Sequence, residues 1–278
     1  MATARINGID LYYEEHGDSA ADPVLLIMGF TMNAGAWIAQ IPALAERYHV
    51  IAFDNRGAGR TSQPDGPYTT RQMADDAAGL LDHLGIASAH VVGASMGGMI
   101  AQEFAVNYPE RVRSLVLACT TPGGPRSAGY QAMMDAGGEA LEAESLEALM
   151  TPERLQESML LAFTPEYMAS PGPAFQQMAV TTLQFPQTLE GMKGQLMGIR
   201  AHDTFDRLSR ITAPTLVMAG TEDTLVDAAN SPLLAERIPN AELHMFPGLR
   251  HGFNVEKPDE VNASILEFLA KHAMKAAA

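Results

Sequence analysis

One short segment combines the residue types needed for nucleophilic catalysis. Residues 93–97 read Gly-Ala-Ser-Met-Gly, which places Ser95 between two glycines. A nucleophile elbow of the G-x-S-x-G type needs a strand that turns sharply into a helix, with glycine where neighbouring backbone comes close. The apolar run 90–94 predicts a strand, and residues 96–107 predict a helix. This context favours a catalytic serine over a structural tight turn.

The elements around Ser95 alternate between short apolar runs and helical patterns, which is typical of a mostly parallel sheet flanked by helices. The predicted strands cover residues 24–28, 50–54, 90–94, 114–120, 215–219 and 241–246. The predicted helices cover residues 37–47, 70–84, 96–107, 232–237 and 258–272. Residues 6–15 predict a hairpin that turns at Asn7-Gly8. The fold class is therefore α/β.

The alternation stops between residues 122 and 207, where the chain is rich in Met, Gly and Pro and has no strand-like run. Thr151-Pro152 and Thr164-Pro165 are typical of helix starts, with threonine at the cap and proline in the first turn. We expect residues 122–207 to form a helical cap inserted into a core of residues 1–121 and 208–278. The methionines suit an adaptable apolar pocket roof, and they equally suit ordinary helix packing.

Four stretches make the chain resemble the α/β-hydrolase family. They are residues 28–31, residues 54–62, the elbow around Ser95, and residues 248–251, each of them after a predicted strand. The chain looks most similar to the branch of small esterases, 3-oxoadipate enol-lactonases and cofactor-free haloperoxidases. The resemblance implies an α/β-hydrolase fold with a helical cap and a reaction that needs no cofactor.

The resemblance also implies an acid partner for Ser95. A serine hydroxyl becomes a good nucleophile only when a base takes its proton. In this family the acid follows the nucleophile and the histidine comes last. Residues 220–223 match the family's acid position, so Asp223 is the predicted acid, and Glu222 and Asp227 remain alternatives.

The predicted base is His251, on the loop after the last strand, where the family places its histidine. His244 lies inside that strand and is expected to point into sheet packing or solvent. The remaining histidines are expected at surface or strand-edge positions without a catalytic role: His16, His49, His83, His90, His202 and His272.

Two backbone amides should form the oxyanion hole, those of Phe30 and Met96. The family usually shows His-Gly in the first of these loops, whereas this chain has Met28-Gly29. The departure is tolerable because the donor is a backbone amide, but it puts the loop's usual hydrogen-bond support in doubt. Trp37 is predicted to line the acyl side of the pocket, with a core position as the alternative. Asp54 and Arg56 are interpreted as structural braces.

The composition of the chain limits the classes of molecule that the protein is expected to bind. The formal net charge of −15 and the pI of about 4.8 disfavour nucleic acid. The single cysteine, Cys119, excludes an intrachain disulfide and is expected to be buried. No metal-binding or dinucleotide motif is present in the sequence. No signal peptide or membrane span is visible, so we expect a cytoplasmic protein that binds a small ester or lactone, with a homodimer left open.

The expected function is a serine hydrolase that cleaves carboxylic esters of small, apolar substrates through an acyl-enzyme. Enol-lactone opening, perhydrolysis and carbon–carbon bond hydrolysis on the same triad are alternatives, and a non-catalytic ligand receptor is a remote one. The acidic charge disfavours a lactone that carries a carboxylate, although Arg56 and Arg250 could offset it locally. Dehalogenases and epoxide hydrolases of this fold place aspartate at the elbow, so Ser95 argues against both.

Overall fold

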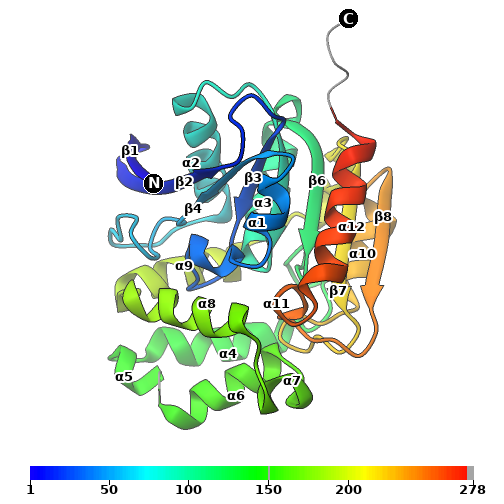
Figure 1. Ribbon diagram of the computed structural model, residues 1–278. Coiled ribbons are helices and arrows are strands. Elements are labelled where there is room, and N and C mark those ends of the chain that lie inside the picture. Colours follow the sequence, from blue (N-terminus) through cyan, green and yellow to red (C-terminus); the bar gives the residue numbers. More distant parts are fainter. Residues whose placement is uncertain (150, 274–278) are drawn as a thin grey trace, which may run out of the picture.

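The computed structural model describes residues 1–149 and 151–273. These residues form one eight-stranded sheet in the order β1-β2-β4-β3-β5-β6-β7-β8, in which β1 and β2 are antiparallel and the other strands run parallel (Figure 1). The strands are β1 (Ala2–Ile6), β2 (Ile9–His16), β3 (Pro23–Ile27), β4 (His49–Phe53), β5 (Ala89–Ala94), β6 (Val112–Ala118), β7 (Thr215–Gly220) and β8 (Ala241–Phe246). The predicted fold class is confirmed.

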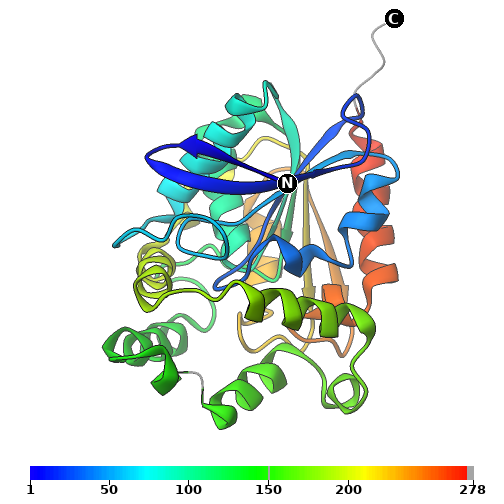
Figure 2. The same cartoon turned by 60° about the vertical axis from the view of Figure 1, so that its left-hand side comes forward.

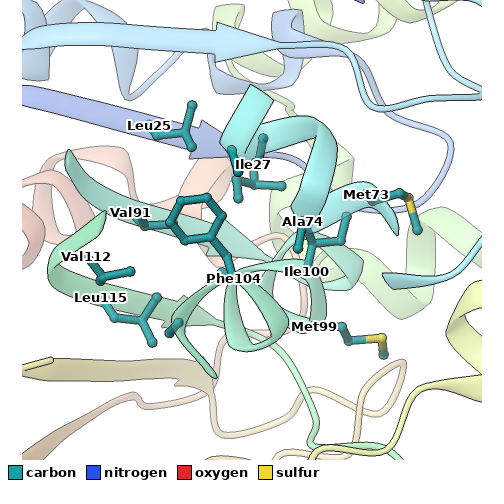
Figure 3. Packing of buried hydrophobic residues seen from close by; sticks show 14 of the residues in the cluster. Leu25, Ile27, Met73, Ala74, Val91, Met99, Ile100, Phe104, Val112 and Leu115 are labelled. Atoms are coloured by element: carbon teal, nitrogen blue, oxygen red, sulfur yellow. The ribbon is translucent and has the colours of Figure 1, made fainter. Parts of the chain in front are cut away.

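Helices cover both faces of this sheet. On one face lie α2 (Thr70–His83), α3 (Met96–Asn107) and α10 (Asn230–Arg237), and on the other lie α1 (Ile41–Ala45), α11 (Phe253–Glu256) and α12 (Pro258–Lys271). Successive residues of a strand point to opposite faces. Leu25 and Ile27 of β3 therefore pack with the first group of helices (Figure 3), and Val24 and Leu26 pack with the second. The two faces give two hydrophobic clusters.

The chain between β6 and β7 is helical, as predicted. It forms α4 (Tyr130–Glu142), α5 (Leu146–Leu149), α6 (Pro152–Ala162), α7 (Pro165–Ala169), α8 (Pro173–Gln184) and α9 (Leu189–Ala201). Figures 1 and 2 show these helices together at one end of the sheet, the end toward which the parallel strands point. Residue 150, one of the methionines of this segment, lies outside the described residues. That residues 122–207 form a separate cap subdomain stays a prediction.

Local sequence signals explain most element boundaries. Asn7 and Gly8, both with positive φ, form the predicted hairpin turn. The Thr151 and Thr164 side chains accept hydrogen bonds from the amides of Arg154 and Tyr167, which confirms both predicted helix caps.

The predicted helix over residues 37–47 is wrong. The structure has a 3-10 turn at Ala34–Trp37 and a separate helix, α1, at Ile41–Ala45. Pro42 lies in the first turn of α1, and proline has no N–H to bond to a preceding turn. A continuous helix therefore cannot pass through this position.

None of the helices in residues 1–149 and 151–273 has both the length and the apolar character needed to cross a bilayer.

Candidate active site

Ser95 lies at the junction of β5 and α3 in unusual backbone geometry, with φ 57° and ψ −123°. A Cβ atom at Gly97 would lie 2.0 Å from the carbonyl oxygen of Ile27, and one at Gly93 would lie 2.3 Å from that of Gly97. Only glycine fits at either position.

The Ser95 amide donates to the Ala118 carbonyl at 2.9 Å, and Ser95 O accepts from Thr120 Oγ1 at 2.8 Å. Main-chain and side-chain contacts therefore hold the strained turn.

Asp223 and His251 are directly paired. His251 Nδ1 lies 2.7 Å from Asp223 Oδ2, and the Asp223 side chain is fully buried. The other carboxylate oxygen accepts from the amides of Leu225 and Val226, each at 3.0 Å. Both oxygens of the acid are therefore used, and one of them orients the imidazole.

The alternative acids lie apart from His251. Glu222 is exposed, and Asp227 accepts a hydrogen bond from the Ala229 amide at 3.0 Å. The Glu222 amide donates to Leu249 O at 2.9 Å and so ties the loop after β7 to the loop after β8. Of the three candidates predicted from the sequence, the structure brings only Asp223 to the histidine.

The Ser95 hydroxyl makes no hydrogen bond to His251 within residues 1–149 and 151–273, so two of the three predicted triad members are directly bonded. Ser95 follows β5, and Cys119 follows the next strand of the sheet, β6. Burial and the nearby Asp223 carboxylate raise the pKa of the Cys119 thiol well above its usual value. The thiol between elbow and acid is thus protonated, which leaves the hydroxyl as the candidate nucleophile.

The loop after β3 passes directly over the nucleophile. A Cβ atom at Gly29 would lie 3.0 Å from Ser95 Cβ and 3.5 Å from Ser95 Oγ. The amides of Phe30 and Met96 donate no hydrogen bond to another residue in the described part of the chain. Both predicted oxyanion donors are thus free to bind a ligand.

Two side chains outside this loop hold its backbone. Asn55 Nδ2 donates to Met28 O at 2.7 Å, and Gln195 Oε1 accepts from the Thr31 amide at 3.1 Å. Gln195 is not among the residues predicted from the sequence. No motif surrounds it, and it lies 164 positions from Thr31.

The structure places Trp37 in the hydrophobic core, where it is 1% exposed and packs with the cluster on the α12 face. Its predicted role in binding substrate stays a prediction.

Asp54 accepts from the Ala34 amide at 2.7 Å, and Arg56 Nε donates to Asp76 Oδ2 at 2.6 Å. Both residues brace neighbouring loops, in agreement with their structural interpretation.

Three of the histidines assigned to surface or strand-edge positions are buried instead: His49, His90 and His202. Burial lowers the pKa of both His90 and His202 to about 4. His202 bonds to Thr70 Oγ1 at 2.9 Å, so it joins the end of α9 to α2. Sequence alone misplaced it because its burial depends on where α9 docks.

Helices α6 and α7 contact the loop that carries His251. The Gly252 amide donates to Ala162 O at 2.6 Å, and a Cβ atom at Gly252 would lie 2.3 Å from the Phe163 ring. Thr164 at the start of α7 bonds through its amide to Glu256 Oε2 at 3.1 Å. The α6–α7 junction is therefore docked one residue away from the predicted base.

No group of three or more His, Cys, Asp or Glu residues in the described ranges could hold a metal ion. A hollow of about 370 Å³ lies elsewhere and is lined by Phe205, Asp206, Ser209, Glu236 and Arg237. It contains no histidine beside its serine. This hollow therefore includes none of the predicted triad residues.

Comparison with known proteins identifies the family of the chain. A protein-family model described as alpha/beta hydrolase fold matches residues 22–258. A protein of Azorhizobium caulinodans named as a carbamate hydrolase, RutD, is 36% identical over 270 residues, which cover 96% of this chain and 98% of that protein. A poly(3-hydroxyalkanoate) depolymerase of Ectopseudomonas oleovorans is 33% identical over 91% of this chain and 86% of its own length.

A solved structure extends the comparison to three dimensions. The enol-lactonase from Burkholderia xenovorans LB400 has a TM-score of 0.84 to this chain at 26% identity, with 96% of this chain and 99% of that one covered. The likeness therefore spans the sheet and the helices between β6 and β7 alike.

Proposed function

The chain belongs to the α/β-hydrolase fold family, and from that premise we propose that it is a serine hydrolase that cleaves carboxylic esters of small, apolar, uncharged substrates. Ser95 is the nucleophile, His251 the general base and Asp223 the acid that orients it. One observation carries the proposal. The Asp223–His251 pair, 2.7 Å apart, lies on the loops after β7 and β8, on the sheet whose strand β5 ends in the strained Ser95 elbow.

The reaction proceeds in two halves. His251 Nε2 takes the Ser95 proton as Oγ attacks the ester carbonyl, and the Phe30 and Met96 amides donate to the oxyanion. His251 then protonates the alcohol oxygen as the C–O bond breaks, which leaves an acyl-enzyme. Water loses a proton to His251 and attacks the acyl carbon, and Ser95 leaves with the proton restored. Asp223 accepts from Nδ1–H throughout and stabilises the imidazolium.

The preference for uncharged substrates is supported by the contacts of Arg56 and by the acidic net charge of the chain. Arg56 is 4% exposed and makes two hydrogen bonds to Asp76. Arg250 donates to the carbonyls of Leu160 and Phe163. Arg56 is therefore committed to Asp76, whereas Arg250 bonds through Nη1 alone, to neutral carbonyls, and makes no ion pair among the described residues. Enol-lactone opening is the second candidate, favoured by the likeness to the Burkholderia enzyme and by the unpaired charge of Arg250, and opposed by the engagement of Arg56 and the net charge of −15.

The preference for apolar substrates is supported by the side chains around the loop beside Ser95. Met32 of that loop packs against the same hydrophobic cluster as Met159, Met168 and Phe175 of α6–α8. Flexible thioethers can adapt to acyl chains of different shape. We assign residues 122–207 the role of a cap that covers the site with this apolar surface.

Hydrolysis of p-nitrophenyl butyrate by the wild type and by Ser95→Ala tests the proposal. The wild type should turn over the ester, and the variant should lose at least about 10⁴-fold in kcat. A matched ester whose acyl chain ends in a carboxylate should give a kcat/KM at least about tenfold lower. Equal rates for wild type and variant would refute Ser95 as nucleophile. A faster reaction with the charged ester would favour the lactonase alternative, and a ligand that binds without turnover would favour a receptor.

A further inference from the structure

Gln195 is a buried polar side chain that the triad leaves unused. It is 0% exposed and lies on α9. Its Oε1 accepts from the Thr31 amide at 3.1 Å and from Gln187 Nε2 at 3.0 Å, and its Nε2 donates to Arg56 O at 2.9 Å. Both acceptor sites of the amide are used. One side chain of α9 thus joins the loop after β3 to the loop after β4.

The loop after β3 needs such support because its backbone is strained. Thr31 has a φ of 62°, which is uncommon for a β-branched residue. Thr31 Oγ1 donates to Phe30 O at 2.7 Å, so the peptide after Phe30 is bonded through Thr31 at its carbonyl and through Gln195 at its amide. An oxyanion donor acts only when it points at the position of the developing charge. The orientation of the Phe30 amide therefore depends on these neighbouring bonds.

Helix α9 delivers Gln195 at a fixed position because it approaches the core closely through its glycines. A Cβ atom at Gly194 would lie 2.5 Å from the Tyr68 ring, and one at Gly191 would lie 2.5 Å from Gly57 O. The Tyr68 amide also donates to Gly194 O at 3.2 Å. Larger residues at these positions would move the helix away and pull Gln195 from Thr31.

We propose that Gln195 is a positioning residue for the oxyanion hole: from α9 it holds the strained Phe30–Thr31 segment so that the Phe30 amide faces the same point as the Met96 amide. In this chain it supplies support that the loop's own Met28 side chain cannot supply by hydrogen bonding. The inference rests on the proposed function. It predicts that kcat depends on Gln195 while KM does not, since the oxyanion forms only in the transition state.

The test compares Gln195→Met with Gln102→Met. Gln102 is also 0% exposed and also bonded through both ends of its amide, to Thr121 O at 3.0 Å and from Thr204 Oγ1 at 2.6 Å, but it does not contact the loop after β3. With p-nitrophenyl butyrate, Gln195→Met should lose about 10- to 100-fold in kcat with KM within about twofold. An alkylboronic acid, which forms a tetrahedral adduct with serine, should bind more weakly by a similar factor. Gln102→Met should keep kcat within about twofold.

Hydrogen exchange of the Thr31 amide measures the loop without relying on turnover. Exchange should be at least about tenfold faster in Gln195→Met and unchanged in Gln102→Met. If the wild type cleaves no ester, the proposed function fails, and the exchange measurement still decides whether Gln195 holds the loop. An unchanged kcat, a rise in KM alone, or unchanged exchange in Gln195→Met would overturn the inference.

A second variant keeps the inference testable if Gln195→Met does not fold. Gln187→Met removes the bonds that Gln187 Nε2 donates to Gln195 Oε1 and to Gly57 O, from a side chain that is partly exposed, and it leaves Gln195 itself in place. It should lower kcat by about 2- to 5-fold, and it should speed exchange of the Thr31 amide by less than Gln195→Met would. A Gln187→Met protein with normal kcat and normal exchange would contradict the proposal.

Discussion

Strands β3, β4, β5 and β7 are buried at every position, whereas helix α6 has no buried residue. Helix α9 belongs to the same segment of the chain as α6 but resembles the strands, with buried positions that include Gly194, Gln195 and Leu196. Parallel strands are covered by helices on both faces, so burial follows from topology. For α6 and α9, burial depends instead on whether the helix packs against the loops of the sheet.

This difference in burial indicates two different roles for the helices between β6 and β7. Helix α9 reaches the loop beside Ser95 and bonds to its backbone. Helix α6 keeps Leu155 and Leu161 about two-fifths exposed, and the contacts of its backbone with the loop of His251 lie in its last turn, at Leu160 and Ala162. We infer that α9 sets reaction geometry, together with the sheet, and that α6 contributes mainly to the surface over the site.

The largest expected effect lies on the sheet side of this comparison, at Asp223. Asp223→Asn should lower kcat for p-nitrophenyl butyrate by about 10⁴-fold, because an amide no longer accepts from His251 Nδ1–H or stabilises the imidazolium. Asp227→Asn is the matched control, since its carboxylate bonds only within its own turn, and it should stay within about threefold of the wild type. A larger loss in kcat for Asp227→Asn than for Asp223→Asn would identify Asp227 as the catalytic acid.

The next effect concerns stability and contrasts two glycines. Gly97→Ala places a Cβ 2.0 Å from Ile27 O, so strand and helix must separate, and the free energy of unfolding should fall by about 3–5 kcal/mol. At Gly138 in α4 the nearest atom would be Arg200 Nη1, 3.6 Å away. Gly138→Ala should therefore be neutral or stabilising by up to about 1 kcal/mol. Urea unfolding of both proteins measures the difference, and similar losses would contradict it.

A leucine pair compares the two helices directly. Leu196 on α9 is 6% exposed and Leu155 on α6 is 42% exposed. Leu196→Ala should cost about 2–4 kcal/mol of unfolding free energy, since it leaves a cavity. Leu155→Ala should change it by no more than about 0.5 kcal/mol. Equal costs in urea unfolding would mean that α6 is as firmly packed as α9.

The smallest expected effect is a pH dependence at His202, where α9 meets α2. Burial lowers the pKa of this histidine from 6.5 to about 4, so between these values the unfolded chain binds the proton that the folded chain excludes. Its contribution to stability is complete above pH 6.5 and is lost as the pH falls toward 4. Between pH 6 and pH 5 the wild type should lose about 1 kcal/mol more than His202→Gln. Equal losses of unfolding free energy in the wild type and in His202→Gln would mean that the His202 ring is exposed to solvent.

Much of the fold could be predicted because its signals are local. Alternation along a strand, the Asn7-Gly8 turn and the threonine caps of α6 and α7 depend on residues within a few positions of one another. The break before α1 also has a local signal, Pro42 in its first turn, which a single helix over residues 37–47 does not take into account. The candidate triad was predicted by family resemblance, and its assignment stays a prediction until Ser95→Ala and Asp223→Asn are measured.

The elbow follows from local sequence alone, since strand, serine, glycines and helix are contiguous within and directly around residues 93–97. Three other features appear only in the folded chain: the acid that pairs with His251, the burial of His202, and the bond from Gln195 to the loop beside Ser95. Each of these depends on a hydrogen bond or a packing contact between segments distant in the chain. Such contacts exist only once the sheet has set where the loops lie and α9 has docked against them through its glycines.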